Sequence, residues 1–399
     1  MDRVRLLVLL TVFVDILGLG VVIPVLPFYV ERFSNSPQAV TTLIAVYAAA
    51  SFLSAPLIGV LSDKYGRRPA LIGSILSTSL GWFIFASGKS LLVLYVGRII
   101  DGLAAGNLPV AQAAITDTVK DEKERGQVLG YVGAIFGIGF IIGPAIGGAL
   151  GHLSVTLPFW FVGALAAVNA VLAYFFLPET RKQQEAHTHP ISLNPFSPMK
   201  RAIQQKDMCS NYLAWGMFGL AVASTQSVYA LFLNVAFGWE EFMVGLLFMA
   251  TGIVLAVNQV FAMRNFWLKK FTEPKLELWM TAAFAFGYVL IGVASFPLFI
   301  VGAILTTFGQ SVLRVVMNSQ MIAKSNPTRR GEVMGISASI VSLTAAIAPL
   351  FAGWLFDLRP SLPFFAAAVF LGIGFFILYS AQKTLPTTLD PRQPVVSEI

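Results

Sequence analysis

Four ionisable side chains stand inside long apolar stretches of this 399-residue chain. Asp15 lies in "VDILGLGVVIPVLP" (14–27), Arg98 and Asp101 lie in "GRIIDG" (97–102), and Arg314 lies in a later stretch. A charged side chain at the centre of a membrane helix costs on the order of 3 kcal/mol, so each one marks a candidate functional site. A carboxylate removed from water binds a proton more readily, so proton binding near neutral pH is the chemistry expected of Asp15.

Asp15 lies about ten residues into its apolar stretch, roughly 15 Å along a helix, which is mid-bilayer. No Lys or Arg lies one helical turn away. Two interpretations stay open: a proton-coupling site, or a permanently protonated acid that hydrogen-bonds a neighbouring helix. Arg98 and Asp101 are three residues apart and share a helix face, so they can pair with each other. Asp101 is the second proton-coupling candidate.

Apolar stretches recur from end to end and set the fold class. The chain is 56% hydrophobic and 12% charged, whereas soluble domains carry about 25% charged residues. A helix needs about 20 apolar residues to cross a bilayer. The sequence predicts an all-α polytopic membrane protein with twelve transmembrane helices, at about 5–30, 39–62, 70–88, 91–116, 127–150, 157–177, 208–235, 241–263, 276–295, 297–321, 331–355 and 361–381.

The distribution of basic residues predicts the orientation. If both termini are cytoplasmic, twelve crossings place the 62–70, 117–126, 178–207, 264–275 and 322–330 loops in the cytoplasm. Of the 27 Lys and Arg residues, only Arg32, Lys89 and Arg359 then fall in outer loops, and Arg98 and Arg314 fall within helices. This is the positive-inside pattern. The net charge of +7 therefore reports topology, and no nucleic-acid partner is expected.

An internal repeat predicts two halves. "RGQVLG" (125–130) recurs 205 residues later as "RGEVMG" (330–335), and "LPFWF" (157–161) recurs at the same offset as "LPFFA" (362–366). We expect two six-helix halves related by a pseudo-two-fold axis. The expected divisions are an N-terminal half at 1–177, a cytoplasmic linker at 178–207, a C-terminal half at 208–382 and a cytoplasmic tail at 383–399.

The stretch "GVLSDKYGRRP" (59–69) resembles the signature loop of the major facilitator superfamily, through Gly59, Leu61, Asp63, Gly66, Arg67 and Arg68. Gly66 suits a tight turn that needs a positive φ. Asp63 is placed to accept hydrogen bonds from a neighbouring helix N-terminus. The resemblance implies a loop that gates conformational change, with Asp117 as the partner of Arg67.

The stretch "GFIIGPAIGG" (139–148) resembles the family's antiporter-type motif in the fifth helix. Its residues here are Gly139, Gly143, Pro144, Gly147 and Gly148. Small residues every four positions give one smooth face for close packing, and Pro144 removes a backbone donor and is expected to bend the helix. A packing face with no antiport role is the alternative interpretation.

Together these stretches resemble the drug/proton antiporter branch of the superfamily, and within it the bacterial tetracycline-efflux proteins. That group carries further acids in helices 3 and 9, but 77–85 and 280–289 contain none here. Leu255 stands where the group has a histidine in helix 8, although Gln259 is kept.

In the facilitator fold, helices 1, 4, 7 and 10 line a central cavity. Polar residues fall on these helices at helical spacing, and Arg314 has a second interpretation, since a long side chain near a helix end can reach the interface. The cavity and substrate candidates, with Gln259 of helix 8, are Arg98, Gln112, Gln226, Tyr229, Gln310, Arg314 and Asn318.

The predicted function is a proton-coupled antiporter that exports small amphipathic compounds by alternating access. The alternative is a facilitator or symporter for a small nutrient such as a sugar. No nucleotide-binding, zinc-protease or hydrolase motif is present, so an enzyme is not expected. Neither a cofactor nor a metal is expected, because the three histidines (His152, His187, His189) lie in predicted loops. The expected partners are substrate, protons and lipid, for a functional monomer in a bacterial inner membrane.

Overall fold

The computed structural model describes residues 3–103, 105, 107–118, 122–181, 194–205, 208–325 and 329–384. Within these ranges every regular element is helical. Twelve helical spans of 19 to 30 residues are long and apolar enough to cross a bilayer, which confirms the predicted crossings. His187, His189 and the rest of 182–193 in the charged linker lie outside the described residues, as do residues 206 and 207.

The helices of the first half precede α9, and those of the second half follow it. They are α1 (Arg3–Val22), α2 (Leu26–Val30), α3 (Pro37–Tyr65), α4 (Arg67–Ala86), α5 (Leu91–Leu103), α6 (Asn107–Asp117), α7 (Glu122–Leu153), α8 (Leu157–Phe176), α9 (Ser197–Gln204), α10 (Cys209–Phe237), α11 (Glu241–Val257), the π-helix η1 (Asn258–Trp267), α12 (Leu268–Lys270), α13 (Glu273–Gly292), α14 (Phe296–Lys324), α15 (Arg330–Leu358) and α16 (Leu362–Thr384).

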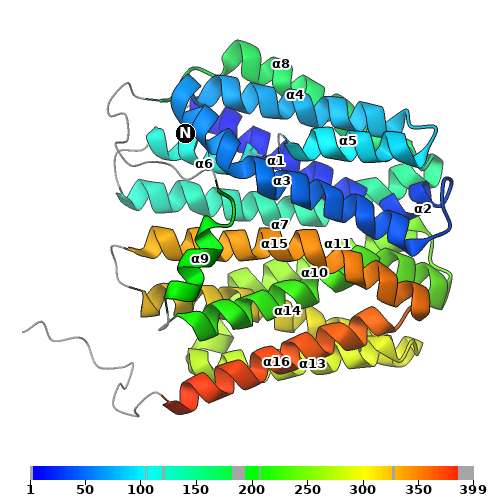
Figure 1. Cartoon of the computed structure of the whole chain (residues 1–399), viewed down its shortest axis with the longest axis vertical. Helices are drawn as coiled ribbons and strands as arrows, with labels where there is room; N and C mark the ends of the chain where they lie inside the picture. Colours follow the sequence, from blue (N-terminus) through cyan, green and yellow to red (C-terminus); the bar gives the residue numbers. More distant parts are fainter. Residues whose placement is uncertain are drawn as a thin grey trace, which may run out of the picture.

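The spanning helices run alongside one another as two groups (Figure 1), α1–α8 in the upper part of the view and α10–α16 in the lower part. The short helix α9 lies at the left end of the bundle. We call this end, which also holds the turn at Gly66, the linker end, and the opposite end the far end. The halves join mainly through two pairs of helices, α3 with α15 and α7 with α11, and α3 also makes a smaller contact with α10. We call the two main contacts the α3–α15 seam and the α7–α11 seam.

Two predicted spans are interrupted by prolines. The first apolar stretch is not one helix over 5–30, because α1 ends at Val22 and the short α2 begins at Leu26. Pro24 and Pro27 lack the N–H that a continuous helix needs there. The fourth span is likewise divided between Leu103 and Asn107. Pro109 has no N–H to donate to the carbonyl four residues earlier, so the helix cannot continue through this position. A new helix, α6, begins at Asn107, with Pro109 in its first turn.

The eighth span is longer than predicted. We expected it to end at residue 263 and a loop to fill 264–275, but the helix continues as η1 and α12 to Lys270. Asn258 stabilises this continuation: its side-chain oxygen accepts a hydrogen bond from Trp267 Nε1 (2.9 Å), and its Nδ2 donates to Ser311 Oγ of α14 (3.0 Å). Polar side chains that satisfy one another let an irregular helix persist inside a membrane protein.

Candidate functional site

A buried ion pair lies at the centre of the first half. Arg98 and Asp101 are 5% and 4% exposed, and Arg98 Nη1 lies 3.1 Å from Asp101 Oδ2. The predicted pairing is therefore present. Gly81 of α4 brings the neighbouring backbone close to this pair, since a Cβ at Gly81 would lie 2.8 Å from Asp101 Cβ. The opposite charges compensate each other where no water is available.

Two aromatic rings enclose the guanidinium. The Arg98 Cζ atom lies 4.1 Å from the ring centroid of Tyr47 and 4.9 Å from that of Trp82. Cation–π contacts of this kind stabilise a desolvated guanidinium. Arg98 Nε has no hydrogen-bond partner within the described part of the chain. Neither ring could be identified from the sequence, because aromatic residues are common on lipid-facing helix surfaces.

Asp15 belongs to the same neighbourhood. It is half-buried in α1, and its carboxylate acts electrostatically on the Tyr47 hydroxyl, which also feels Arg98 and Asp101. The structure thus brings both proton-coupling candidates and Arg98 around one tyrosine. Asp15 differs from Asp101 in being less deeply buried.

The polar candidates of the second half are more accessible. Arg314 is exposed although it lies well inside α14, and Asn318 Nδ2 donates to its carbonyl oxygen (2.7 Å). Gln310 is half-buried on the same stripe, so this face of α14 borders accessible space. Gln226 of α10 is exposed, whereas Tyr229 packs among Phe248, Phe299 and Phe364 as part of an aromatic cluster.

The last two cavity candidates, Gln112 and Gln259, lie next to or within irregular stretches of helix. Gln112 is half-buried on α6, which begins after the interruption of the fourth span. Gln112 therefore does not share one continuous helix with Arg98 and Asp101. Gln259 is exposed on η1, where the π-helical geometry changes the face that each side chain occupies.

The predicted gating loop is held by a charge network at the linker end. Arg67 lies 2.6 Å from Asp63 and 3.0 Å from Asp117, so the partner implied by the resemblance is present. Gly66 has a φ of 110°, the positive value expected of it. Arg68 donates to the carbonyl oxygen of Tyr174 on α8 (2.6 Å). The network joins α3, α4, α6 and α8 into one unit.

Glu179 is a residue of this network that sequence reasoning missed. We expected Asp63 to cap a helix N-terminus, but Asp63 is engaged with Arg67, and Glu179 caps α4 instead. Its carboxylate accepts from the backbone N–H of Arg67 (2.9 Å) and of Arg68 (3.2 Å). A Cβ at Gly66 would overlap Glu179, so the glycine serves both the turn and the cap. Glu179 lies just after the sixth span and 112 residues from Arg67, so the sequence does not indicate this contact.

The small residues of the fifth helix pack on two neighbours. Gly139, Gly143 and Gly147 face α1, and a Cβ at Gly143 would lie 2.8 Å from the Cα of Gly20. Gly148 faces α11, where a Cβ would lie 2.8 Å from the carbonyl oxygen of Glu241. Pro144 lies inside α7, which runs without interruption from Glu122 to Leu153. The motif therefore joins α1 to α7 and also closes the α7–α11 seam.

The two seams are closed at the far end and open at the linker end. Gly353 of α15 packs on Thr41 of α3, and Gly148, which lies 205 residues earlier, packs on α11. Nearer the linker end, the space beside the glycines of both helices is empty: nothing lies within 4 Å of a Cβ placed at Gly130, Gly133 or Gly335. The halves therefore diverge toward the linker end.

A buried acid in the second half was also missed. Glu277 of α13 is 1% exposed, and its Oε2 accepts from Gln320 Nε2 (3.0 Å). Its Oε1 has no hydrogen-bond partner among the described residues. Hydropathy placed Glu277 at the edge of a span, where acids normally contact water, so only the packing of α14 over α13 shows that it is buried.

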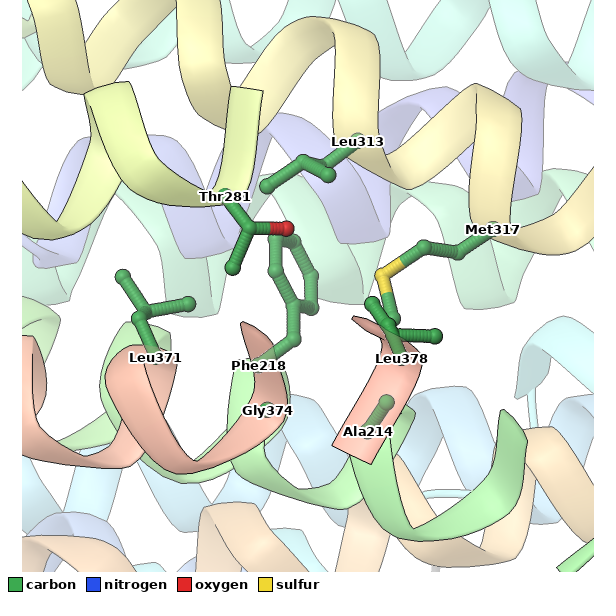
Figure 2. Close-up of a pocket in the computed structure, with 8 residues that line it drawn as sticks. All are labelled: Ala214, Phe218, Thr281, Leu313, Met317, Leu371, Gly374 and Leu378. Atoms are coloured by element: carbon green, nitrogen blue, oxygen red, sulfur yellow. The ribbon is translucent and has the colours of Figure 1, made fainter. Parts of the chain in front are cut away.

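A small cavity lies deeper in the same half, between α10, α13, α14 and α16 (Figure 2). Its volume is about 10 Å³, close to the minimum for one water molecule. Thr281 supplies its hydroxyl, which already donates to the carbonyl oxygen of Glu277 (2.7 Å), and the other lining residues are apolar. The cavity is too small for a substrate. No group of three metal-binding side chains occurs in the described ranges.

The site and the fold define a twelve-helix membrane transporter built from two six-helix halves. The sequence profile described as Major Facilitator Superfamily matches residues 8–264 and 208–397, and the chain belongs to this superfamily. It is 31% identical over 357 residues to the tetracycline resistance protein, class C, of Escherichia coli, covering 88% of each chain. It is 27% identical to multidrug resistance protein 2 of Bacillus subtilis (strain 168), covering 96% of this chain and 97% of that one.

Two further comparisons agree with this assignment. The quinolone resistance protein NorA of Staphylococcus aureus (strain MSSA476) is 26% identical, over 89% of this chain and 90% of that one. A solved structure of the nucleoside transporter NupG (D323A mutant) has the same fold, with a TM-score of 0.78 at 12% identity over 96% of this chain and 100% of that one. The chain is thus a multi-pass membrane transporter whose relatives include drug-resistance proteins.

Proposed function

We propose that the chain is a proton-coupled antiporter that exports small amphipathic compounds by alternating access. The observation that carries the coupling proposal is the contrast between two acids around Tyr47. Asp101 is buried and paired with Arg98, whereas Asp15 is only half-buried. An acid that can exchange protons with water is the better carrier, so Asp15 binds the transported proton and Asp101 holds Arg98.

Arg314 supplies a positive charge on an exposed face of α14. The described residues include no acid within 4.0 Å of it. A positive charge favours the ionised form of a carboxylate in the same water-filled space. Arg314, or a charged group of the substrate that screens it, therefore changes the proton affinity of Asp15 during the cycle.

Drug export is supported by the names of the relatives, which are tetracycline, multidrug and quinolone resistance proteins. The basic loops favour an orientation with the linker end and both termini in the cytoplasm. In this orientation the divergent seams face the cytoplasm and admit substrate from that side. Closure of the linker end and opening of the far end then release substrate outside. A single chain contains both halves, so a monomer suffices, in a bacterial inner membrane.

Purified protein in liposomes with an internal pH-sensitive dye tests the proposal. Hydrophobic cations, tetracycline, fluoroquinolones and sugars are added in turn. We expect an amphipathic drug to trigger proton movement in the wild type and in Glu277→Gln, and not in Asp15→Asn. Loss of proton movement in Glu277→Gln alone would move the coupling acid to the second half. Sugar equilibration without proton movement would favour the alternative, a nutrient facilitator.

A further inference from the structure

The α3–α15 seam has a definite register that identifies where it opens. Thr41 of α3 lies against Gly353 of α15, and the two helices are antiparallel neighbours across the halves. Eighteen residues further along α3 is Gly59, and eighteen residues back along α15 is Gly335. Nothing lies within 4 Å of a Cβ placed at either glycine. These two glycines would therefore meet if the linker end closed.

The open part of this seam is bridged by the segment 194–201. The ring of Phe196 lies edge-on to that of Phe52 in α3, at 5.3 Å between centroids, and α9 also contacts α15. Figure 1 shows α9 lying across the linker end of the bundle. Behind this segment lies a cavity of about 230 Å³, which we call the seam pocket. Residues of α3, α6 and α15 and of the segment itself line it.

The walls of the seam pocket follow the register. Phe52 and Ser342 lie opposite each other, and Ala55 lies opposite Ser339. Pro56, Pro109, Pro195 and Pro198 add rigid apolar surface. A pocket with rigid apolar walls and a few polar groups is the usual form of a small-molecule site.

Arg201 gives the seam pocket its charge preference. The lining contains no acidic residue, and no described acid lies within 4.0 Å of Arg201. The hydroxyls of Ser197 and Ser342 can also donate hydrogen bonds to an anion, whereas that of Ser339 already donates to the carbonyl oxygen of Gly335 (3.0 Å). A guanidinium binds a carboxylate through charge-assisted hydrogen bonds, and a cation would meet only repulsion here.

We propose that the seam pocket binds a compact apolar molecule carrying one anionic group, and that a bound molecule holds the linker end open. The occupant is a free small molecule, because the pocket is below the roughly 300 Å³ of a drug-sized site and far too small for a two-chain lipid. The second part of the proposal rests on alternating access. A bound molecule is expected to hold the linker end open because the seam pocket lies between the faces of α3 and α15 that must meet when Gly59 and Gly335 approach.

The binding test uses the full chain in phosphatidylcholine nanodiscs, with 1-naphthaleneacetate as probe and 1-naphthylmethylammonium as its charge-reversed match. Equilibrium dialysis measures the Kd. We expect Arg201→Gln to weaken binding of the acetate by about tenfold, the loss of one charge-assisted contact. Lys200→Gln, an exposed neighbour on the same helix that does not line the pocket, is the matched control and is expected to bind as the wild type does. Ser339→Leu fills the pocket and is expected to abolish binding.

Equal binding of both probes, or equal effects of Arg201→Gln and Lys200→Gln, would refute the proposal that the seam pocket binds an anionic molecule through Arg201. Binding that falls as phosphatidylglycerol is added would show that a lipid headgroup occupies it instead. The second readout is the rate of disulfide formation in a Gly59→Cys/Gly335→Cys variant that also carries Cys209→Ser. Bound 1-naphthaleneacetate is expected to slow this rate. An unchanged rate would overturn the proposal that a bound molecule holds the linker end open. Neither readout measures transport, so either result stands apart from the antiport proposal.

Discussion

The ionisable residues inside the helices differ in burial, and the roles proposed for them follow from this difference. Arg98 is enclosed by Tyr47 and Trp82 and paired with Asp101, so its charge is satisfied in place. Asp15 is half-buried and Arg314 is exposed. A closed pair is suited to fixing the positions of helices, and an accessible acid is suited to exchanging protons.

Asp101→Asn is expected to destabilise the protein by about 3 kcal/mol, because the variant leaves the Arg98 charge buried without its partner. The midpoint of thermal unfolding measures the loss. The double variant Arg98→Met/Asp101→Leu removes both charges and is expected to recover most of it. Additive losses in the double variant would contradict a self-compensating pair.

Glu31 gives a pH-dependent prediction at the far end. Burial raises the pKa of Glu31, and the negative charge of Glu241, from the opposite half, raises it further. A raised pKa means that the folded protein binds this proton more tightly than the unfolded chain does, so this contribution favours folding as the pH falls. Ionised Glu31 therefore destabilises the folded protein. This penalty is absent below the ordinary pKa of about 4.3, and it is complete once the pH exceeds the raised pKa of Glu31.

Glu31→Gln removes that penalty. Its midpoint of thermal unfolding is expected to equal that of the wild type at pH 4, to exceed it as the pH rises, and to keep a constant gain once the pH has passed the raised pKa of Glu31. Glu240→Gln, next to Glu241, serves as the control and is expected to show no such trend. A gain for Glu31→Gln that is already complete at pH 4 would refute the charge explanation.

At the scale of helices, hydropathy and the internal repeat predicted the spans and the two halves, because these features depend on local composition. The twelve spans follow from apolar length, the Gly66 turn follows from the loop motif, and the Arg67–Asp117 pair is implied by the resemblance to the superfamily. The π-helix after Val257 depends on Asn258 contacting Trp267 and Ser311, and periodicity cannot detect such contacts. The cap by Glu179 and the burial of Glu277 likewise come from packing between distant helices.

Helix α15 offers a matched pair of positions for testing the α3–α15 seam. Gly353→Val is expected to push the far end apart, because its side chain would overlap Thr41. Gly335→Val fits the present arrangement, where the space is empty, and obstructs closure of the linker end. Both variants are expected to transport at least tenfold more slowly, an order-of-magnitude expectation for a blocked rocking step.

Their accessibility is expected to differ in direction. A cysteine at Gln38, in a Cys209→Ser background, reports the far end through its rate of alkylation by a membrane-impermeant maleimide. Gly353→Val is expected to raise that rate and Gly335→Val to lower it. Shifts in the same direction would mean that the two substitutions damage the fold generally.

At the scale of the whole molecule, the repeat explains why one motion serves both seams. Gly148 and Gly353 are equivalent positions of the two halves, and each packs across to the other half at the far end. Gly130 and Gly335 are equivalent too, and both border empty space at the linker end. A rotation about the pseudo-two-fold axis therefore closes both seams at one end while it opens both at the other.

Two disulfides can each hold one end shut, since Cys209 is the single native cysteine and can be removed. Gly59→Cys/Gly335→Cys closes the linker end. Gly151→Cys/Glu241→Cys closes the far end, where a Cβ at Gly151 would lie 3.1 Å from Glu241 Cγ. Both oxidised variants are expected to stop drug-driven proton movement in liposomes, and reduction is expected to restore it. The second disulfide should form faster in the resting protein, because its residues are already adjacent. Transport that continues with either end locked would rule out rocking of the halves as the transport motion.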